Sequence, residues 1–169
     1  MIMKIMIKMI MLQKKFNNFF EILFSLNNIE NNLIYLNIKF AYCKIKSEFF
    51  ESINNFKSLR YLYIENINFD KDFIIKLNIL ELLSIISCNN IKLSEIPNEK
   101  LKELVISRNY ISDFNILEKV KFKFKELIKL KLSYNKISDI NLLENVNFKG
   151  LIVLNLSNNE ISDINILKK

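Results

Sequence analysis

Residues 127–137, LIKLKLSYNKI, and two near copies of them, residues 101–111, LKELVISRNYI, and residues 151–161, LIVLNLSNNEI, decide the fold of this chain. Each copy follows the pattern LxxLxLxxNxI, counted here from position one at the opening leucine. In an extended strand, positions four and six point to one side, and positions three, five and seven point to the other. Each copy therefore predicts a short strand that buries leucines on one face only.

The same spacing continues towards the N-terminus with lower fidelity. Six units are recognisable, and their opening leucines are Leu33, Leu59, Leu80, Leu101, Leu127 and Leu151, which lie 21 to 26 residues apart. A degenerate unit is predicted from Ile7, because Ile7, Ile10 and Leu12 repeat the apolar spacing 26 residues before Leu33. A unit of this length cannot bury its own apolar face, so the units must stack. We therefore expect residues 1–169 to form a single repeat domain.

Position nine carries an asparagine in the three regular units, at Asn109, Asn135 and Asn159. We expect each asparagine to satisfy backbone groups that the turn after the strand leaves unpaired. Cys88 holds the same position in its unit, which predicts a buried structural thiol rather than a reactive one. Ala41 and Ile67 hold it in the first two clear units and predict looser turns there.

The segments between strands carry a second apolar pattern. After the turn, residues 111–122 and 137–148 share ISDxNxLExVxF, and apolar residues about three apart (Ile137, Ile140, Leu143 and Val146) predict one or two turns of 3-10 or α-helix behind the sheet. Earlier units look more plainly helical, with Phe49, Phe50, Ile53 and Phe56 on one face and Phe16, Phe19, Phe20 and Leu23 on another. We expect Asp113, Asp139 and Asp163 to cap these turns, because one carboxylate per unit is too few for a calcium site.

These residues resemble the leucine-rich repeat family. The last three units, with NxIxDI after the strand, are similar to the short-repeat class found in internalins and in the regulatory subunit of protein phosphatase 1. The resemblance implies an α/β solenoid in which a parallel sheet lines a concave face and short helices or 3-10 turns cover the convex side. It also implies a protein as the usual ligand.

Composition excludes most catalytic designs. The chain has no histidine, one glycine, Gly150, and two cysteines, Cys43 and Cys88, which are too far apart in sequence for a zinc motif. Phosphate-binding loops need several glycines. We therefore expect no enzyme activity, no cofactor and no metal, and the sparse cysteines favour a reducing, cytoplasmic setting.

The formal charge of +7 permits a nucleic acid or an anionic membrane as a partner. Lysine, asparagine, isoleucine and phenylalanine, which A/T-rich codons encode, are all abundant, so a coding bias explains the charge and a nucleic acid partner is unlikely. The first twelve residues, MIMKIMIKMIML, lack a cleavage site and are too short to span a bilayer. The sequence therefore predicts neither export nor a membrane partner.

The strand positions that face away from the core predict where a partner binds. Positions three, five, seven and eight form columns about 4.8 Å apart across a stacked sheet. The candidate concave-face residues in these columns are Tyr35, Phe40, Tyr61, Tyr63, Glu65, Glu103, Arg108, Lys129, Lys131 and Tyr134. Aromatic residues and arginine dominate interface energetics, although tyrosine and phenylalanine also suit any half-buried sheet. The hypothesis is a non-catalytic scaffold that binds a protein partner.

Three other interpretations remain open at this stage. Residues 19–26, FFEILFSL, faintly resemble an F-box and raise the possibility of a substrate-recognition subunit of a ubiquitin ligase, although the leading Leu-Pro is absent. Nucleic acid binding would use Lys121, Lys123, Lys125, Lys129 and Lys131. The core begun by Ile161, Ile164 and Leu167 has no following unit to cover it, so we expect either that the chain is a piece of a longer array or that two copies associate through the C-terminal edge.

Overall fold

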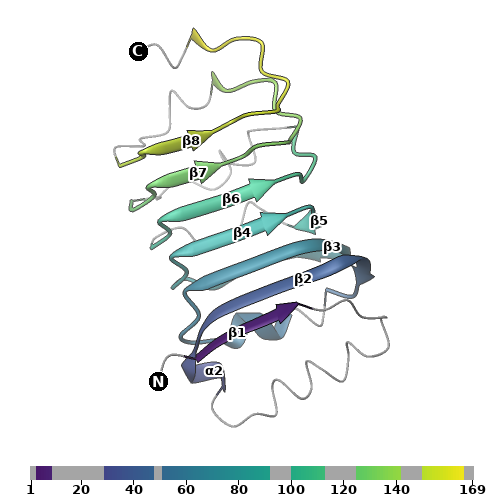
Figure 1. Cartoon of the computed structure of the whole chain (residues 1–169), viewed down its shortest axis with the longest axis vertical. Helices are drawn as coiled ribbons and strands as arrows, with labels where there is room; N and C mark the ends of the chain where they lie inside the picture. Colours follow the sequence, from purple (N-terminus) through teal and green to yellow (C-terminus); the bar gives the residue numbers. More distant parts are fainter. Residues whose placement is uncertain are drawn as a thin grey trace.

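The computed structural model describes residues 3–8, 29–47, 51–91, 100–112, 125–141 and 150–165, which form one eight-stranded sheet. Its strands are β1 (Met3–Lys8), β2 (Leu33–Ile45), β3 (Tyr61–Phe73), β4 (Leu82–Ile86), β5 (Asn89–Ile91), β6 (Glu103–Ser107), β7 (Lys129–Lys131) and β8 (Val153–Asn155). The order is β1-β2-β3-β4-β6-β7-β8, with β5 paired to β3, and every pairing is parallel. Sequence neighbours thus lie side by side in a curved stack (Figure 1). The predicted parallel solenoid is confirmed.

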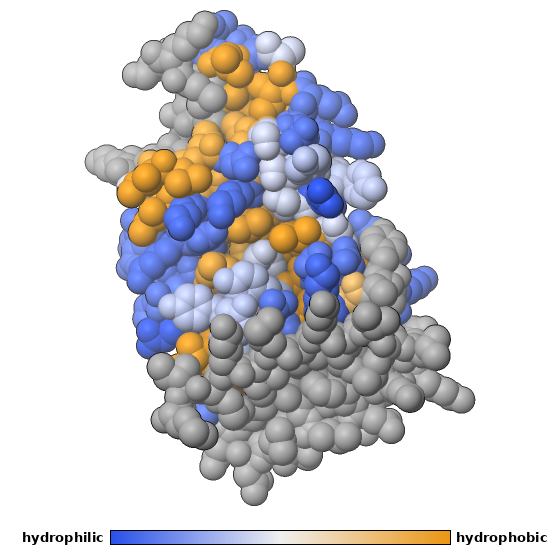
Figure 2. Space-filling model, viewed as in Figure 1, coloured by the Kyte–Doolittle hydropathy of each residue, from blue (hydrophilic) through white to orange (hydrophobic). Residues whose placement is uncertain are grey.

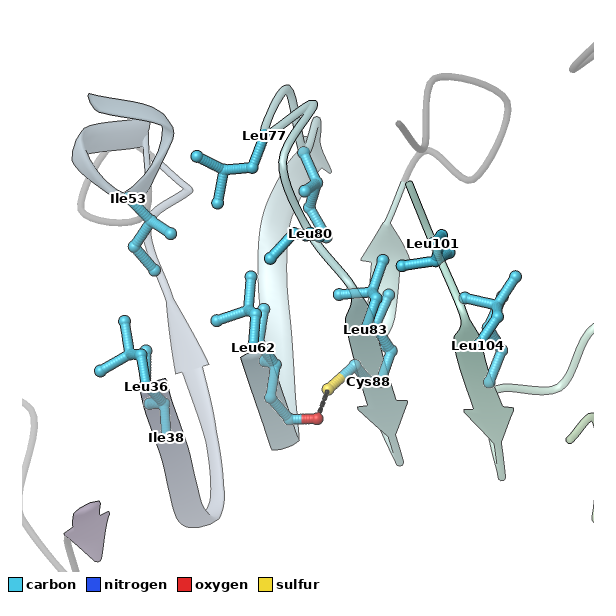
Figure 3. Close-up of a cluster of buried hydrophobic side chains, with 14 of the residues drawn as sticks. Leu36, Ile38, Ile53, Leu62, Leu77, Leu80, Leu83, Cys88, Leu101 and Leu104 are labelled. Carbon is cyan, nitrogen blue, oxygen red and sulfur yellow. Dashed lines mark hydrogen bonds between the residues drawn. The ribbon is translucent and has the colours of Figure 1, made fainter. Parts of the chain in front are cut away.

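Position four of each unit holds the sheet in register. Leu36 pairs with Leu62, Leu62 with Leu83, Leu83 with Leu104, Leu104 with Leu130, and Leu130 with Leu154. The first five of these leucines are completely buried, and several of them form a row behind the strands (Figure 3). Burying one leucine side chain contributes about 1.5–3 kcal/mol to folding, so this row is a main source of stability.

The asparagines at position nine form the predicted ladder. Asn135 accepts hydrogen bonds at Oδ1 from the backbone N–H groups of Asn109 (2.9 Å) and Ile111 (3.2 Å). Its Nδ2 donates to the carbonyl oxygens of Ile106 (2.8 Å) and Leu132 (3.0 Å). Each bond either joins adjacent units or closes the turn of its own unit. The ladder therefore replaces the backbone pairing that ends with the strand.

Cys88 occupies a step of the same ladder, as predicted. Its Sγ lies 3.7 Å from the carbonyl oxygen of Ile64 in the preceding unit and 3.2 Å from that of Ile86 (Figure 3). Its backbone N–H donates to Oδ1 of Asn109 at 2.8 Å. Burial raises the pKa of the Cys88 thiol to about 12, which keeps it protonated and unreactive at neutral pH.

The first two clear units depart from the prediction of looser turns. Position nine there lies inside long strands, because β2 and β3 each run for 13 residues and pair again at Cys43 and Ile67. Ile67 is completely buried. The pairing is interrupted between Lys39 and Cys43, where Nδ2 of Asn66 donates to the carbonyl oxygen of Phe40 at 3.1 Å, and it resumes where Cys43 pairs with Ile67. The predicted loosening at these two positions is wrong.

The first strand also lies in a different register from the one predicted. In β1, Ile5 pairs with Leu36 and Ile7 with Ile38, so Ile7 holds position six and not position one. Ile2, Ile5 and Ile7 carry the spacing of positions one, four and six equally well. An apolar run that fits several frames is placed by its pairing with β2, and the sequence alone does not provide that information.

The connections behind the sheet are only partly described. The helices with described bounds are α2 (Ile29–Asn32) and the 3-10 helix η1 (Ser52–Asn55), and the predicted face of η1 is buried at Ile53 and Phe56. Ile137 and Ile140 are buried as expected. Phe16, Phe19, Phe20, Leu23, Phe49, Phe50, Leu143 and Val146 lie outside the described residues. Within the described part, helices are too short or too polar to cross a membrane.

Candidate functional site

Three tyrosines meet on the face of the sheet that points away from the core. The ring centroid of Tyr35 lies 6.4 Å from that of Tyr61 and 5.1 Å from that of Tyr63, and all three side chains are half-buried. The pairing of β2 with β3 produces this contact, because Tyr35 lies opposite Tyr61 at position three and Tyr63 follows at position five. We call these residues the tyrosine cluster. Figure 2 shows a pale area, of intermediate hydropathy, over the left part of β2 and β3.

The surroundings of Tyr63 keep its phenol neutral. Burial raises the pKa of Tyr63 above its ordinary value, and the neighbouring Tyr35, Glu103 and Tyr61 raise it further. The apolar surface continues onto β4, where Leu82 pairs with Tyr61 and is also half-buried. The cluster therefore offers ring faces for packing and hydroxyl groups for hydrogen bonds.

Paired charged residues flank the tyrosine cluster. Lys39 lies 2.6 Å from Glu65, while Glu103 lies 2.8 Å from Lys131 and 3.5 Å from Lys129. Partial burial alone would raise the pKa of Glu103, but the hydrogen bond from Lys131 and the charges of both lysines hold it below its ordinary value. Exposed pairs contribute about 0–1 kcal/mol each to stability. We call these five residues, which lie beside the tyrosines, the charged border.

Phe40 does not belong to this surface, and its predicted placement is wrong. Its side chain is 4% exposed and packs in the core. In later units, position eight takes a positive φ, between 53° and 61° at Asn66, Ser87, Arg108, Tyr134 and Asn158. Phe40 takes no such φ. The side chain at position eight is therefore directed inward in this unit.

Arg108 and Tyr134 lie together at the other end of the strands. The guanidinium of Arg108 lies over the ring of Tyr134, 4.7 Å from its centroid. Both residues line an open pocket of about 330 Å³, with Asn66, Ser87, Asn89 and Tyr110. Sequence reasoning did not single out Asn89 or Tyr110. Tyr110 lies at position ten, a column that we had not assigned to the surface, and it is 69% exposed.

The candidate residues thus divide into three groups on one open sheet: the tyrosine cluster, the charged border and the strand-end pocket. This chain is similar to the solved structure of an internalin, InlF, from Listeria monocytogenes, with 25% sequence identity and a TM-score of 0.58. The match covers 85% of this chain. This chain has the internalin-like leucine-rich repeat fold.

The leucine-rich repeat chain spans 40% of the length of that internalin. No model of a protein family matches the sequence, and a search of curated proteins found no match. The fold is typical of protein-binding repeat domains and generally non-catalytic.

The aspartates after the turns hydrogen-bond locally in this leucine-rich repeat chain. Oδ1 of Asp139 accepts from the backbone N–H of Asn141 and Oδ1 of Asp163 from that of Asn165, both at 2.8 Å, while Asp113 lies outside the described residues. The two described aspartates thus bond in the way that capping predicts. Among the described residues, no group of three or more histidine, cysteine, aspartate or glutamate residues could hold a metal ion.

The leucine-rich repeat structure describes only some of the residues on which the alternative interpretations depend. Residues 19–26, the segment that resembles an F-box, and Lys121 and Lys123 lie outside the described residues. Lys125 is exposed, whereas Lys129 and Lys131 pair with Glu103. That pairing reduces the positive charge available for a phosphate backbone.

Proposed function

We propose that this chain is a non-catalytic scaffold that binds a protein partner on the concave face of its sheet. The tyrosine cluster carries the proposal. Tyr35, Tyr61 and Tyr63 are held together on an exposed sheet face, with Leu82 beside them. Aromatic residues are enriched at interface centres because they add a large contact area at a low cost in side-chain entropy.

The charged border supports the same interpretation. Protein interfaces commonly have an apolar centre and a polar rim. Here Lys39 and Glu65 lie further along the strands that carry the tyrosines, and Glu103 with its two lysines lies on β6 and β7, beyond β4. Because each of these three lysines lies within 4 Å of one of the two glutamates, the group keeps a net charge of only about +1, and the surface favours a partner with mixed polarity over a polyanion.

The chemistry of the described residues favours binding over catalysis. Cys88 is a nucleophile only as a thiolate, and the raised pKa of its buried thiol suppresses that form. The sequence has no histidine to serve as a base. We propose a reducing, cytoplasmic setting as well, because the buried Cys88 is present as a free thiol.

Affinity capture tests the proposal. A partner isolated with the wild-type chain should be lost with the double variant Tyr61→Ser/Tyr63→Ser, because both ring faces disappear, and its affinity should fall about 100-fold or more. The matched control is Lys57→Ser/Lys76→Ser, which changes two exposed residues outside the sheet. Equal binding by the two double variants would remove the tyrosine cluster from the interface.

A further inference from the structure

The strand-end pocket lies apart from the tyrosine cluster, where the chain leaves the strands. Asn66 lies in β3 and Asn89 in β5, while Ser87, Arg108, Tyr110 and Tyr134 follow β4, β6 and β7. Its volume of about 330 Å³ is near the lower limit of small-molecule sites, roughly 300–1,000 Å³. A site of this size fits one side chain or a short segment.

The backbone fixes the direction of the two central side chains. Arg108 and Tyr134 hold position eight in consecutive units, with φ of 60° and 56°. The N–H of Arg108 donates to the carbonyl oxygen of Ser133 at 3.2 Å, and that of Tyr134 donates to the carbonyl oxygen of Ser157 at 3.0 Å. The backbone of each residue is therefore tied to the following unit, which brings the two side chains to adjacent places in the stack.

The charge at this pocket is positive, and Arg108 has no acidic partner in the described part of the chain. No carboxylate among the described residues lies within 4 Å of Arg108, and none of the pocket-lining residues is acidic. A second cation lies nearby, because Nζ of Lys136 is 5.7 Å from the ring centroid of Tyr110. By contrast, Arg60, Lys39, Lys102, Lys129 and Lys131 all lie within 4 Å of glutamates.

The contact with Tyr134 leaves Arg108 able to bind an anion. A guanidinium that stacks on a ring uses its face, and its N–H donors point outward in the plane of the group. That planar fork matches the two oxygens of a carboxylate. The polar side chains of Asn66 and Ser87 line the same pocket. Its shape and charge together suit an acidic side chain entering from solvent.

We propose that the strand-end pocket binds an aspartate or glutamate side chain of an acidic peptide segment, with Arg108 as the carboxylate receptor and Tyr134 as the residue that orients it. This site is separate from the tyrosine cluster and does not depend on the function proposed for it. It gives the surface a second contact point that recognises negative charge.

Binding of a labelled octaglutamate peptide, measured by fluorescence anisotropy, tests the site. Arg108→Gln should weaken binding about tenfold, because the charge-assisted contact is lost. The matched control is Arg60→Gln, which also removes one positive charge but from a residue paired with Glu81 at 2.9 Å. That control should change affinity less than about twofold. Tyr134→Leu should weaken binding partially, since Arg108 keeps its charge but loses the aromatic ring that orients its guanidinium.

Backbone amide NMR shifts during the titration provide an independent location for the peptide. The shifts should be concentrated at Ser87, Arg108 and Tyr134, and thermal unfolding of each variant should resemble that of the wild type. Tyr61→Ser/Tyr63→Ser should bind the peptide normally, so failure of this site and failure of the proposed function are distinguishable.

Three results would overturn the proposal. Equal weakening by Arg108→Gln and Arg60→Gln would reveal diffuse attraction to a basic chain. Shifts confined to other surfaces would place the peptide elsewhere. Displacement of the peptide by an oligouridylate that binds more tightly, and loses its affinity in Arg108→Gln, would make the pocket a nucleic acid site instead.

Discussion

Asn135 shows how one side chain holds a turn of the solenoid in place. It is almost fully buried, and its amide group makes at least four bonds to backbone groups of its own and the preceding unit. Asn135→Ala would leave those groups buried without partners, and each such group costs about 1–3 kcal/mol. We predict a loss of about 4 kcal/mol or more in the free energy of unfolding, measured with urea.

The matched change for Asn135→Ala is Asn78→Ala, in an exposed turn. It should alter the free energy of unfolding by less than about 0.5 kcal/mol. Similar losses of unfolding free energy from both variants would show that the hydrogen bonds of the asparagine ladder do not stabilise the turns.

Cys88 links stability to pH. Its folded pKa, about 12, is raised above the ordinary value of 9.0. The folded state therefore favours the protonated thiol, so the stabilisation is complete below pH 9 and is lost as pH rises from 9 towards 12. In a Cys43→Ser background, Cys88→Ala should flatten this alkaline fall in denaturant unfolding. An unchanged alkaline fall would contradict the assigned burial of the thiol.

At the scale of elements, the long strands β2 and β3 make Ile67 a core residue. It lies at the ladder position but is fully buried and paired with Cys43. Ile67→Asn, which restores the consensus residue, should destabilise the chain by about 2–5 kcal/mol, because the amide enters an apolar site. Ile67→Val should cost about 0.5–1.5 kcal/mol. If Ile67→Asn left the midpoint of thermal unfolding unchanged or raised it, the burial of position 67 within β3 would be contradicted.

The elements differ in how far the sequence predicts them. The strands before Asn109, Asn135 and Asn159 were predicted correctly, because leucine spacing and a turn asparagine agree there. The ends of β2 and β3 were not, since sequence propensity does not say whether a backbone without a turn residue will keep pairing with its neighbour. Phe40 was not predicted to be buried either, because position eight lacks the positive φ there that it takes in the later units.

Across the whole molecule, the sequence predicted the columns of side chains on the sheet better than the pocket at the ends of the strands. The meeting of Tyr35, Tyr61 and Tyr63 follows from the unit spacing alone. The strand-end pocket does not, because it requires positive φ at position eight, which glycine or asparagine would signal but Arg108 and Tyr134 do not.

The edge strand β8 leaves apolar side chains exposed among the described residues. Leu154 is half-buried, and Ile152 is 80% exposed. Self-association through this edge stays a prediction. It is independent of the tyrosine cluster, because β8 lies at the opposite end of the sheet order from β2 and β3.

The concave binding surface is the central claim, and site-specific photo-crosslinking tests it most directly. A benzophenone side chain placed at Tyr63 should crosslink the captured partner, and excess unlabelled wild-type chain should suppress that product. The same probe at Lys57, an exposed residue outside the sheet, should give no such product. Equal crosslinking from the two positions, or a product only from Lys57, would contradict binding on the concave face.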